Sequence, residues 1–173
     1  MSIGAYLQVM HTPHVQQKIS GVQFNNMGRQ SEDRFGLQIL YSGSLPGTDI
    51  SFNSFHNSNH RCIVLEGSHN ITVSSNVGVG NSGHCVYIDW NSRDNVINGN
   101  FVSDTRAISQ TKLISGSDDN YASGFYSKNG PNTFTNNIAV GSRYHGFSIT
   151  SDEKTRIEVR VYFHVNKCLY LAL

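Results

Sequence analysis

The sequence carries little charge and no excess of either sign, with 13 basic and 12 acidic side chains among 173 residues. This balance gives no broad basic field, so we expect neither a nucleic-acid partner nor binding to an anionic membrane surface. No apolar run approaches the roughly 20 residues of a transmembrane helix. Residues 1–6 also lack the basic start and apolar core of a secretory signal peptide. We therefore expect no membrane span and no signal peptide in this chain.

Motifs of several large enzyme classes are absent as well. The sequence has no P-loop, no glycine fingerprint for nucleotides, no Cys or His spacing typical of zinc and no nucleophile elbow. Its three cysteines, Cys62, Cys85 and Cys168, do not make a disulfide framework. These absences disfavour nucleotide-dependent enzymes, zinc proteins and hydrolases with a nucleophilic serine.

What the sequence does contain is a repeat. An apolar residue (Ile50, Val73, Ile97 or Phe134) lies three positions before each of four asparagines: Asn53, Asn76, Asn100 and Asn137. The intervals between these asparagines are 23, 24 and 37 residues, so the last interval holds an insertion of about 13 residues. A period between about 20 and 50 residues is the signature of a solenoid.

A second apolar run repeats in step with the first. Residues 62–65 lie 23 positions before residues 85–88, and residues 146–149 take the matching place in the last copy. The runs are short, rich in Val, Ile, Phe and Tyr, and bounded by Gly, Asn, Ser and Asp, which favours strands. Strands at the same place in successive turns run parallel. We therefore predict an all-β fold, a right-handed single-stranded parallel β-helix with rungs of about 23–24 residues; a β-sandwich with coincidentally spaced turns is the alternative.

A column of asparagine at one corner fits this fold. Stacked amides can hydrogen-bond along the column, and asparagine tolerates the left-handed backbone of a sharp bend. Cys62 and Cys85 occupy equivalent rung positions, so we expect stacked, buried thiols. A bridge between them is the alternative, although in-register neighbours rarely give good disulfide torsions.

The repeat divides the chain into two parts. We assign residues 1–150 to the β-helix, with early strands expected at 6–10, 21–28 and 35–41 and a turn at 42–47. The insertion, residues 104–122, is expected to form a loop that projects from one face and could cover a cleft; a disordered excursion is the alternative. In residues 151–173, apolar and polar residues alternate from Ile157 to Val165, which indicates a C-terminal strand or cap, or a divergent tail.

An ordered set of short motifs resembles a known family. The motifs are residues 7–16 (LQVMHTPHVQ), 21–30 (GVQFNNMGRQ), 60–63 (HRCI), 76–78 (NVG), 83–85 (GHC) and 136–142 (NNIAVGS), with Gly146 and Phe147. They resemble the segment after the eight-glycine domain in hyaluronan-binding and hyaluronan-depolymerising proteins of the cell-migration-inducing type, in transmembrane protein 2 and in the fibrocystins. The resemblance covers roughly residues 5–150. It implies a β-helix from a larger multidomain protein, extracellular or at the cell surface, with an acidic polysaccharide as partner.

One departure from this family concerns its chemistry. Where the family has a strand of the type Tyr-Pro-Ile-His-Phe-His, this sequence has Gln38 and Leu40 in place of the two histidines. If those histidines contribute to cleavage or to a metal site, the resemblance implies that this chain is impaired or inactive.

His84 is the first candidate for acid/base chemistry, because it lies at the start of a strand within a motif of that family. A neutral imidazole can act as a general acid or base near pH 7; a corner histidine bonded to backbone is the alternative. His60 lies one rung earlier, and Glu66 and Asp89 are each expected in the turn after a strand. Together these side chains would form an acidic, imidazole-bearing ridge that suits sugar hydroxyls or a Ca²⁺ ion. Turn carboxylates are usually only solvated, so no metal ligands are assigned.

Cationic and aromatic side chains are the candidates for holding an acidic polysaccharide. Guanidinium groups pair with uronate carboxylates, and aromatic faces stack on sugar rings; ordinary surface is the alternative. Asn70, Ile71 and Thr72 fit an N-glycosylation acceptor, which is usable only in a secreted protein. The candidate binding residues are Arg61, Arg93, Arg106 and Arg143, together with Tyr87, Trp90 (the only tryptophan) and Tyr144.

Two functions stay open at this point. One is an extracellular-type module that binds or processes polysaccharide; as an enzyme it would cleave a glycosaminoglycan-like chain with His84, His60 and Asp89 as catalytic residues and Arg61 or Arg93 holding carboxylates. The other is a non-catalytic structural or adhesion solenoid, which the missing histidines favour. The abrupt start and the altered tail also fit an incomplete fragment with no independent function. The β-helix fold by itself does not choose between them.

Overall fold

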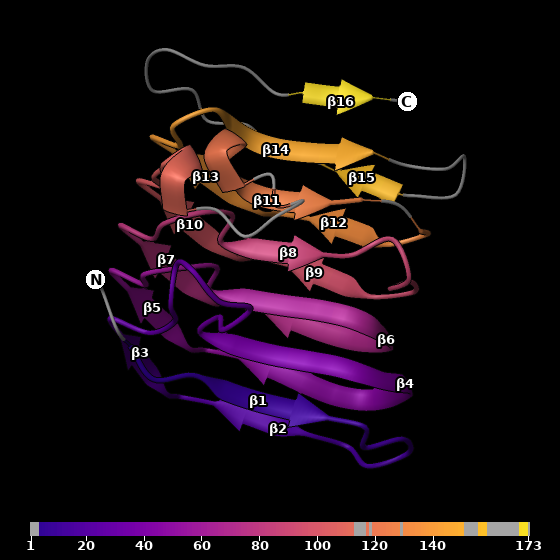
Figure 1. The fold of residues 1–173 in the computed structure, drawn as a ribbon. Coiled ribbons are helices and arrows are strands. Elements are labelled where there is room, and N and C mark those ends of the chain that lie inside the picture. Colours follow the sequence, from indigo (N-terminus) through magenta and orange to yellow (C-terminus); the bar gives the residue numbers. More distant parts are fainter. Residues whose placement is uncertain are drawn as a thin grey trace.

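The computed structural model describes residues 4–112, 117, 119–128, 130–150, 156–158 and 170–172. These residues form strands, turns and two short 3-10 helices, η1 (Gln110–Lys112) and η2 (Asp119–Tyr121), with no α-helix among them. The strands stack rung upon rung from the N-terminal to the C-terminal end of the chain (Figure 1). The predicted parallel β-helix is therefore confirmed.

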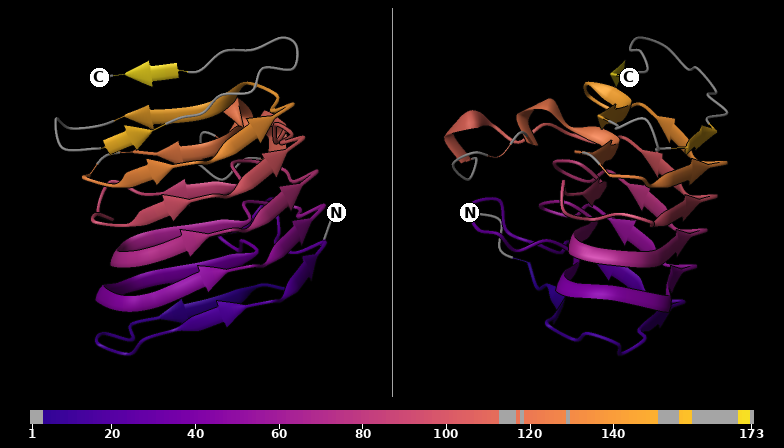
Figure 2. Two further views of the ribbon diagram at one scale, coloured as in Figure 1. Left: turned by 180° about the vertical axis from the view of Figure 1, so that it is seen from behind. Right: turned by 90° about the vertical axis from the view of Figure 1, so that its right-hand side faces the viewer.

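Three columns of parallel strands form the faces of the solenoid (Figure 2). The first face holds β1 (Leu7–Met10), the first parts of β4 (Leu37–Ser51) and β6 (Ile63–Ser74), then β8 (Val86–Ile88), β11 (Ser123–Ser127), β14 (His145–Thr150) and β16 (Tyr170–Ala172). The second face holds β2 (Lys18–Ser20), the last parts of β4 and β6, then β9 (Val96–Asn98), β12 (Thr133–Thr135) and β15 (Arg156–Glu158). The third face holds β3 (Gln23–Asn25), β5 (Ser54–His56), β7 (Val77–Val79), β10 (Phe101–Ser103) and β13 (Ile138–Val140).

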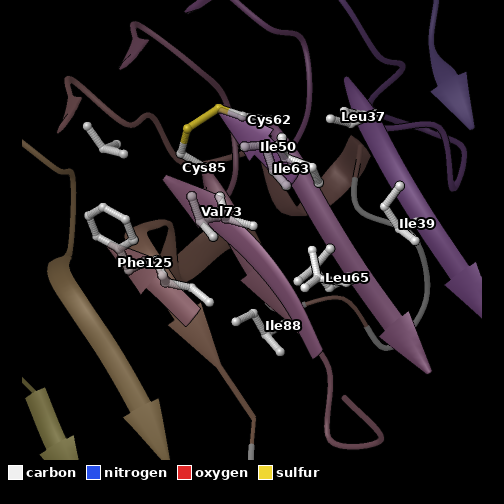
Figure 3. Close-up of a cluster of buried hydrophobic side chains, with 14 of the residues drawn as sticks. Leu37, Ile39, Ile50, Cys62, Ile63, Leu65, Val73, Cys85, Ile88 and Phe125 are labelled. Carbon is white, nitrogen blue, oxygen red and sulfur yellow. A yellow bond between two sulfur atoms is a disulfide. The ribbon is translucent and has the colours of Figure 1, made fainter. Parts of the chain in front are cut away.

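The register of these strands matches the repeat in the sequence. Val73 pairs with Ile50 in one neighbouring rung and with Ile97 in the other, and Ile97 pairs with Phe134. Because successive side chains of a strand point to opposite faces, all four of these point inward and are buried. Inward side chains of successive rungs stack into one continuous core (Figure 3). Burying each such apolar side chain contributes about 1.5–3 kcal/mol, before the cost of ordering the chain.

The asparagine column forms a ladder of hydrogen bonds at one corner. The side-chain amide of Asn53 donates to Oδ1 of Asn76 (3.0 Å), Asn76 to Asn100 (3.0 Å), and Asn100 to Asn137 (2.9 Å). Each Oδ1 also accepts the backbone N–H of the asparagine before it in the ladder. The left-handed backbone falls one residue earlier than predicted, as at Ser75 (φ 54°), so the ladder asparagines keep ordinary backbone angles.

A second asparagine ladder was not predicted. It lies between the first and second faces, where Oδ1 of Asn95 accepts the Ile71 N–H (3.0 Å) and the Asn95 amide donates to Oδ1 of Asn132 (3.0 Å). The two ladders together satisfy buried backbone groups at two corners of the solenoid, which a turn without side-chain partners would leave unpaired.

The expectation of free thiols at Cys62 and Cys85 is wrong. The two cysteines form a disulfide between adjacent rungs, with their Cα atoms 4.6 Å apart and both residues buried. Parallel in-register strands place equivalent Cα atoms about 4.8 Å apart, which lies within the range that a disulfide spans. Stacking of the two positions therefore brings the cysteines close enough to form the disulfide.

The turn expected at 42–47 is instead a bend inside a continuous strand. β4 runs through it, with irregular register between Leu40 and Gly43 and between Ser44 and Thr48. β6 turns the same corner in the next rung, so Glu66, which was expected in a turn, lies within β6. The long strands arise because each bend keeps its backbone pairing with the neighbouring rung.

The insertion and the tail are described only in part. The insertion carries η1 and η2, and residues 113–116 and 118 lie outside the described residues. In the tail, β15 pairs with β12 and β16 pairs with β14, both parallel. Most of the alternating segment predicted from Ile157 to Val165 lies outside the described residues.

Candidate functional site

A cleft of about 390 Å³ lies on the outer side of the first face, and we call it the outer cleft. Strand alternation creates its floor: Leu37 and Ile39 point into the core, whereas Gln38 and Leu40 point outward and line the cleft. The positions where the resembling family has histidines therefore lie in this cleft. Its charged lining residues are Asp33, Arg34, Arg61, Glu66, Asp89 and Lys128.

Aromatic rings form a second apolar cluster beneath the outer cleft. Tyr87 of β8 stacks on Tyr126 of β11 with ring centroids 5.3 Å apart and planes within 4°. The Arg61 guanidinium carbon lies 3.6 Å from the centroid of Tyr87 and 4.8 Å from that of Phe35. Cation–π contacts of this kind are stronger where water is excluded. The cluster consists of Phe35, Leu40, Val64 and Tyr87, with Tyr126 packed against it.

The charge of Arg61 is neutralised by Asp119, which comes from the insertion. Nε of Arg61 donates to Oδ1 and Oδ2 of Asp119 (3.0 and 3.1 Å), and an Nη atom donates to Oδ2 (2.7 Å). Both residues are buried. Burial alone would raise the pKa of the Asp119 carboxyl, but the charges of Arg61 and His84 and the hydrogen bonds from Arg61 outweigh it and hold that pKa well below its usual range.

His84 lies beneath the cleft and is fully buried. Its backbone N–H donates to Oδ1 of Asp119 (3.1 Å), and its Nε2 lies 3.9 Å from the same oxygen. Its Nδ1 accepts the backbone N–H of Ser123 (3.1 Å), and its ring packs 4.1 Å from that of Tyr126. This bond to backbone matches the structural alternative given for His84, a corner histidine bonded to backbone. Through it, His84 holds the start of β11, the strand that follows the insertion.

His60 is also buried, at the edge of the same cluster. Its Nδ1 accepts the Arg61 backbone N–H (3.0 Å), and its ring packs edge-on against Phe35. Burial lowers the pKa of His60, Asp119 opposes this shift, and Arg61 and His84 add to it, so that the pKa is about 4. Within the described residues Nε2 has no hydrogen-bond partner. His60 is therefore neutral near pH 7, and both imidazoles lie under the cleft instead of on an open ridge.

The two predicted ridge carboxylates do line the outer cleft, on adjacent rungs. The Tyr41 hydroxyl donates to Glu66, a bond that, with burial and the Glu66 charge, raises the pKa of Tyr41 to about 12. Oδ1 of Asp89 accepts the Gly67 N–H (3.2 Å) and the Ser92 hydroxyl (2.7 Å). Among the described residues, no group of three or more His, Cys, Asp or Glu is arranged to hold a metal ion. The Ca²⁺ alternative thus finds no ligand set in this part of the chain.

The predicted binding residues are divided between different surfaces. Arg61, Tyr87 and Trp90 line the outer cleft, and Trp90 is 66% exposed at its rim. Arg143 and Tyr144 line a separate hollow of about 380 Å³. The remaining two are in neither: Arg93 is exposed beside Asp94, and Arg106 pairs with Asp104.

Sequence reasoning missed Asp119, which organises the buried side of the site. The insertion has two adjacent aspartates, Asp118 and Asp119, and no periodicity that shows which one turns inward. The insertion was expected to project from one face as a loop, whereas its Asp119 turns inward and pairs with buried Arg61. A buried arginine needs a counter-ion, so the only available signal was an arginine placed next to a core strand.

Several proteins of known sequence are similar to this chain over about three quarters of its length. A G8 domain-containing protein of Dictyostelium discoideum is 29% identical over 147 residues, covering 76% of this chain and 13% of the relative. Communication mutant protein F of the same organism is 30% identical over 149 residues, covering 77% and 13%, and protein rliB is 27% identical over 153 residues, covering 79% and 14%. This chain therefore spans only a small part of the length of these relatives.

Two further observations concern solved structures and membrane-spanning helices. No solved structure is significantly similar to this chain. In the described part of the chain, no helix has the length and apolarity that crossing a membrane requires. The family model described as CEMIP beta-helix matches residues 2–167, so the chain belongs to the CEMIP β-helix family.

Proposed function

We propose that this chain is an extracellular module that binds a polysaccharide in the outer cleft without cleaving it. The observation that carries the proposal is the exposed ring of Trp90 at the rim of a concave cleft, because the Tyr87 ring in the floor is already covered by Arg61 and Tyr126. Ligand sites are commonly concave, largely apolar surfaces with a few placed polar groups. A sugar ring presents one apolar face for stacking, and its hydroxyls can donate to Glu66 and Asp89.

Family membership and the disulfide support the extracellular part of the proposal. The motifs that resemble cell-surface proteins run through the β-helix itself. The bond between Cys62 and Cys85 persists in an oxidising compartment and is rare in the cytosol.

The charges that line the outer cleft do not favour an acidic polysaccharide over a neutral one. The cleft lining holds three cations and three carboxylates, and the buried cation, Arg61, is paired with Asp119. The cleft therefore has no net positive field that would concentrate an acidic chain. We expect hyaluronan or chondroitin to bind through ring stacking and hydroxyl contacts, with only a weak dependence on salt.

Cleavage is left out because the imidazoles predicted as acid and base are covered. His84 and His60 are both buried and already accept backbone hydrogen bonds, so a glycosidic oxygen cannot approach them in this arrangement. A second candidate function, glycosidic hydrolysis, is favoured by one observation: Glu66 and Asp89 line one cleft from adjacent rungs. Paired carboxylates are the usual catalysts of that reaction.

The test is incubation of the chain, with its disulfide intact, with size-defined hyaluronan, chondroitin and a neutral polysaccharide. Retention of the polysaccharide and its chain length are read from the same samples. We expect retention without shortening, and we expect it to weaken several-fold in Trp90→Ala but not in Tyr121→Ala, which alters another exposed ring (55% against 66%) outside the outer cleft. Shortening that is lost in Glu66→Gln would support hydrolysis, and absence of both effects would leave a structural solenoid.

A further inference from the structure

One sequence motif is not used by the outer cleft. Asn70, Ile71 and Thr72 form the acceptor pattern for N-glycosylation, with a residue other than proline in the middle. The chain has 18 asparagines, and Asn70 is the only one followed two positions later by Ser or Thr. The buried ladder asparagines lack the pattern, so a modification that would disrupt the core has no acceptor there.

The structure places Asn70 where a bulky attachment is tolerated. It is exposed, has a left-handed backbone (φ 59°) and lies in the bend of β6 between the first and second faces. The next residue, Ile71, points into the core and is fully buried, so the two side chains leave the strand in opposite directions. Asn70 therefore projects from an outer corner, away from the packed interior.

The side-chain amide of Asn70 also has an N–H group to spare. Nδ2 donates one hydrogen bond, to the Ser44 hydroxyl (2.8 Å) in the preceding rung. An asparagine amide carries two N–H bonds, and the second has no acceptor among the described residues. Replacing that second hydrogen removes no contact from the fold.

We propose that Asn70 is an N-glycosylation site. In the transfer, Nδ2 of Asn70 attacks the anomeric carbon of an oligosaccharide carried on a lipid diphosphate. The new carbon–nitrogen bond forms as the bond from the anomeric carbon to the diphosphate oxygen breaks. The lipid diphosphate leaves with the electron pair, and one amide proton is released. The proposal rests on the extracellular part of the proposed function, because the transfer takes place in the secretory pathway.

A glycan on Asn70 would lie near both the outer cleft and Arg93. Glu66 in the outer cleft is four residues away along β6, which is at most about 13 Å at 3.3 Å per residue. The Asn70 backbone N–H donates to the carbonyl of Arg93 in the next rung (3.3 Å). The glycan therefore starts close to the outer cleft and occupies the surface around Arg93, which makes Arg93 unavailable to a polysaccharide.

Two substitutions at Thr72 make a matched test. Thr72→Ser keeps the acceptor pattern, whereas Thr72→Val removes it and keeps the branched shape of a half-buried strand residue. Each chain is produced behind a secretory leader in eukaryotic cells, and total cell extract and medium are analysed by intact mass before and after N-glycosidase. Loss of the leader in the same spectrum establishes that the chain entered the secretory pathway.

We expect one glycan per chain in the parent and in Thr72→Ser, and none in Thr72→Val. A parent chain that has lost its leader but keeps the mass of the unmodified polypeptide would overturn the proposal, as would a glycan that persists in Thr72→Val. Polysaccharide retention is measured on the same Thr72→Val sample. Its failure alongside a glycosylated parent would refute the binding function and leave the modification site standing.

Discussion

Replacing Asp119 with alanine would leave the Arg61 guanidinium buried beside Tyr87 and Phe35 without its counter-ion. Removing one partner of a buried ion pair costs about 3–5 kcal/mol, because the remaining charge is desolvated and unpaired. With a urea m-value of about 2 kcal/mol per molar, the unfolding midpoint should fall by roughly 2 M. The measurement is urea unfolding followed by circular dichroism.

The chain offers an exposed ion pair as the control. Arg106 and Asp104 are joined at 2.8 Å, but their side chains are 56% and 58% exposed. Arg106→Ala should cost no more than about 1 kcal/mol, since exposed pairs are weak. If Asp119→Ala costs no more than Arg106→Ala, the buried pair does not stabilise the fold.

Acid should remove this stabilisation in a defined pH range. The folded-state pKa of Asp119 lies below the ordinary value of 3.8, so its contribution is fully present above about pH 4 and is lost as the pH falls from there towards the folded-state pKa. The difference between the parent and Asp119→Ala should therefore be constant from pH 7 to about 5 and shrink below pH 4. A difference that disappears between pH 7 and 5 would show that another group carries the effect.

Three further predictions concern the scaffold. Asn76→Ala removes a buried amide that makes ladder bonds on both sides, and it should cost more than about 3 kcal/mol in urea unfolding, whereas exposed Asn91→Ala should be near neutral. Reducing the bond between Cys62 and Cys85, which closes a loop of 23 residues, should lower stability by about 2–5 kcal/mol, and no change on reduction would contradict a structural role. Because the folded-state pKa of His60 is about 4 against 6.5, about 3 kcal/mol should be lost between pH 6.5 and 4, and His60→Asn, which keeps an acceptor, should flatten that slope.

Much of the fold could be predicted because stacking imposes a rule on the sequence. In a parallel solenoid, equivalent positions of successive rungs meet the same environment, so Val73 and Asn76 recur as similar residues at the rung interval. The interval then predicts the strand register directly. β11 was missed because Ser123 and Gly124 lack the β-branched character of the other strands, and its pairing with β8 is held by tertiary packing.

The candidate site was less predictable because it depends on contacts that have no period. The outward residues Tyr87 and Asp89 follow from strand alternation, so their place in the cleft could be anticipated. The burial of His84 could not, because it follows from the way the insertion folds back and brings Asp119 against Arg61. The disulfide between Cys62 and Cys85 was not expected, because in-register neighbours rarely have good disulfide torsions. That general preference does not determine whether one particular pair of cysteines is bonded.

The central claim, that a polysaccharide binds in the outer cleft, is tested most directly by the fluorescence of Trp90. It is the only tryptophan in the chain and lies exposed at the rim of that cleft, so its emission reports on this site alone. Titration with a hyaluronan or neutral oligosaccharide should give a saturable blue shift as the sugar ring covers the indole. Retention of the polysaccharide with no change in Trp90 emission would place binding elsewhere and contradict the account.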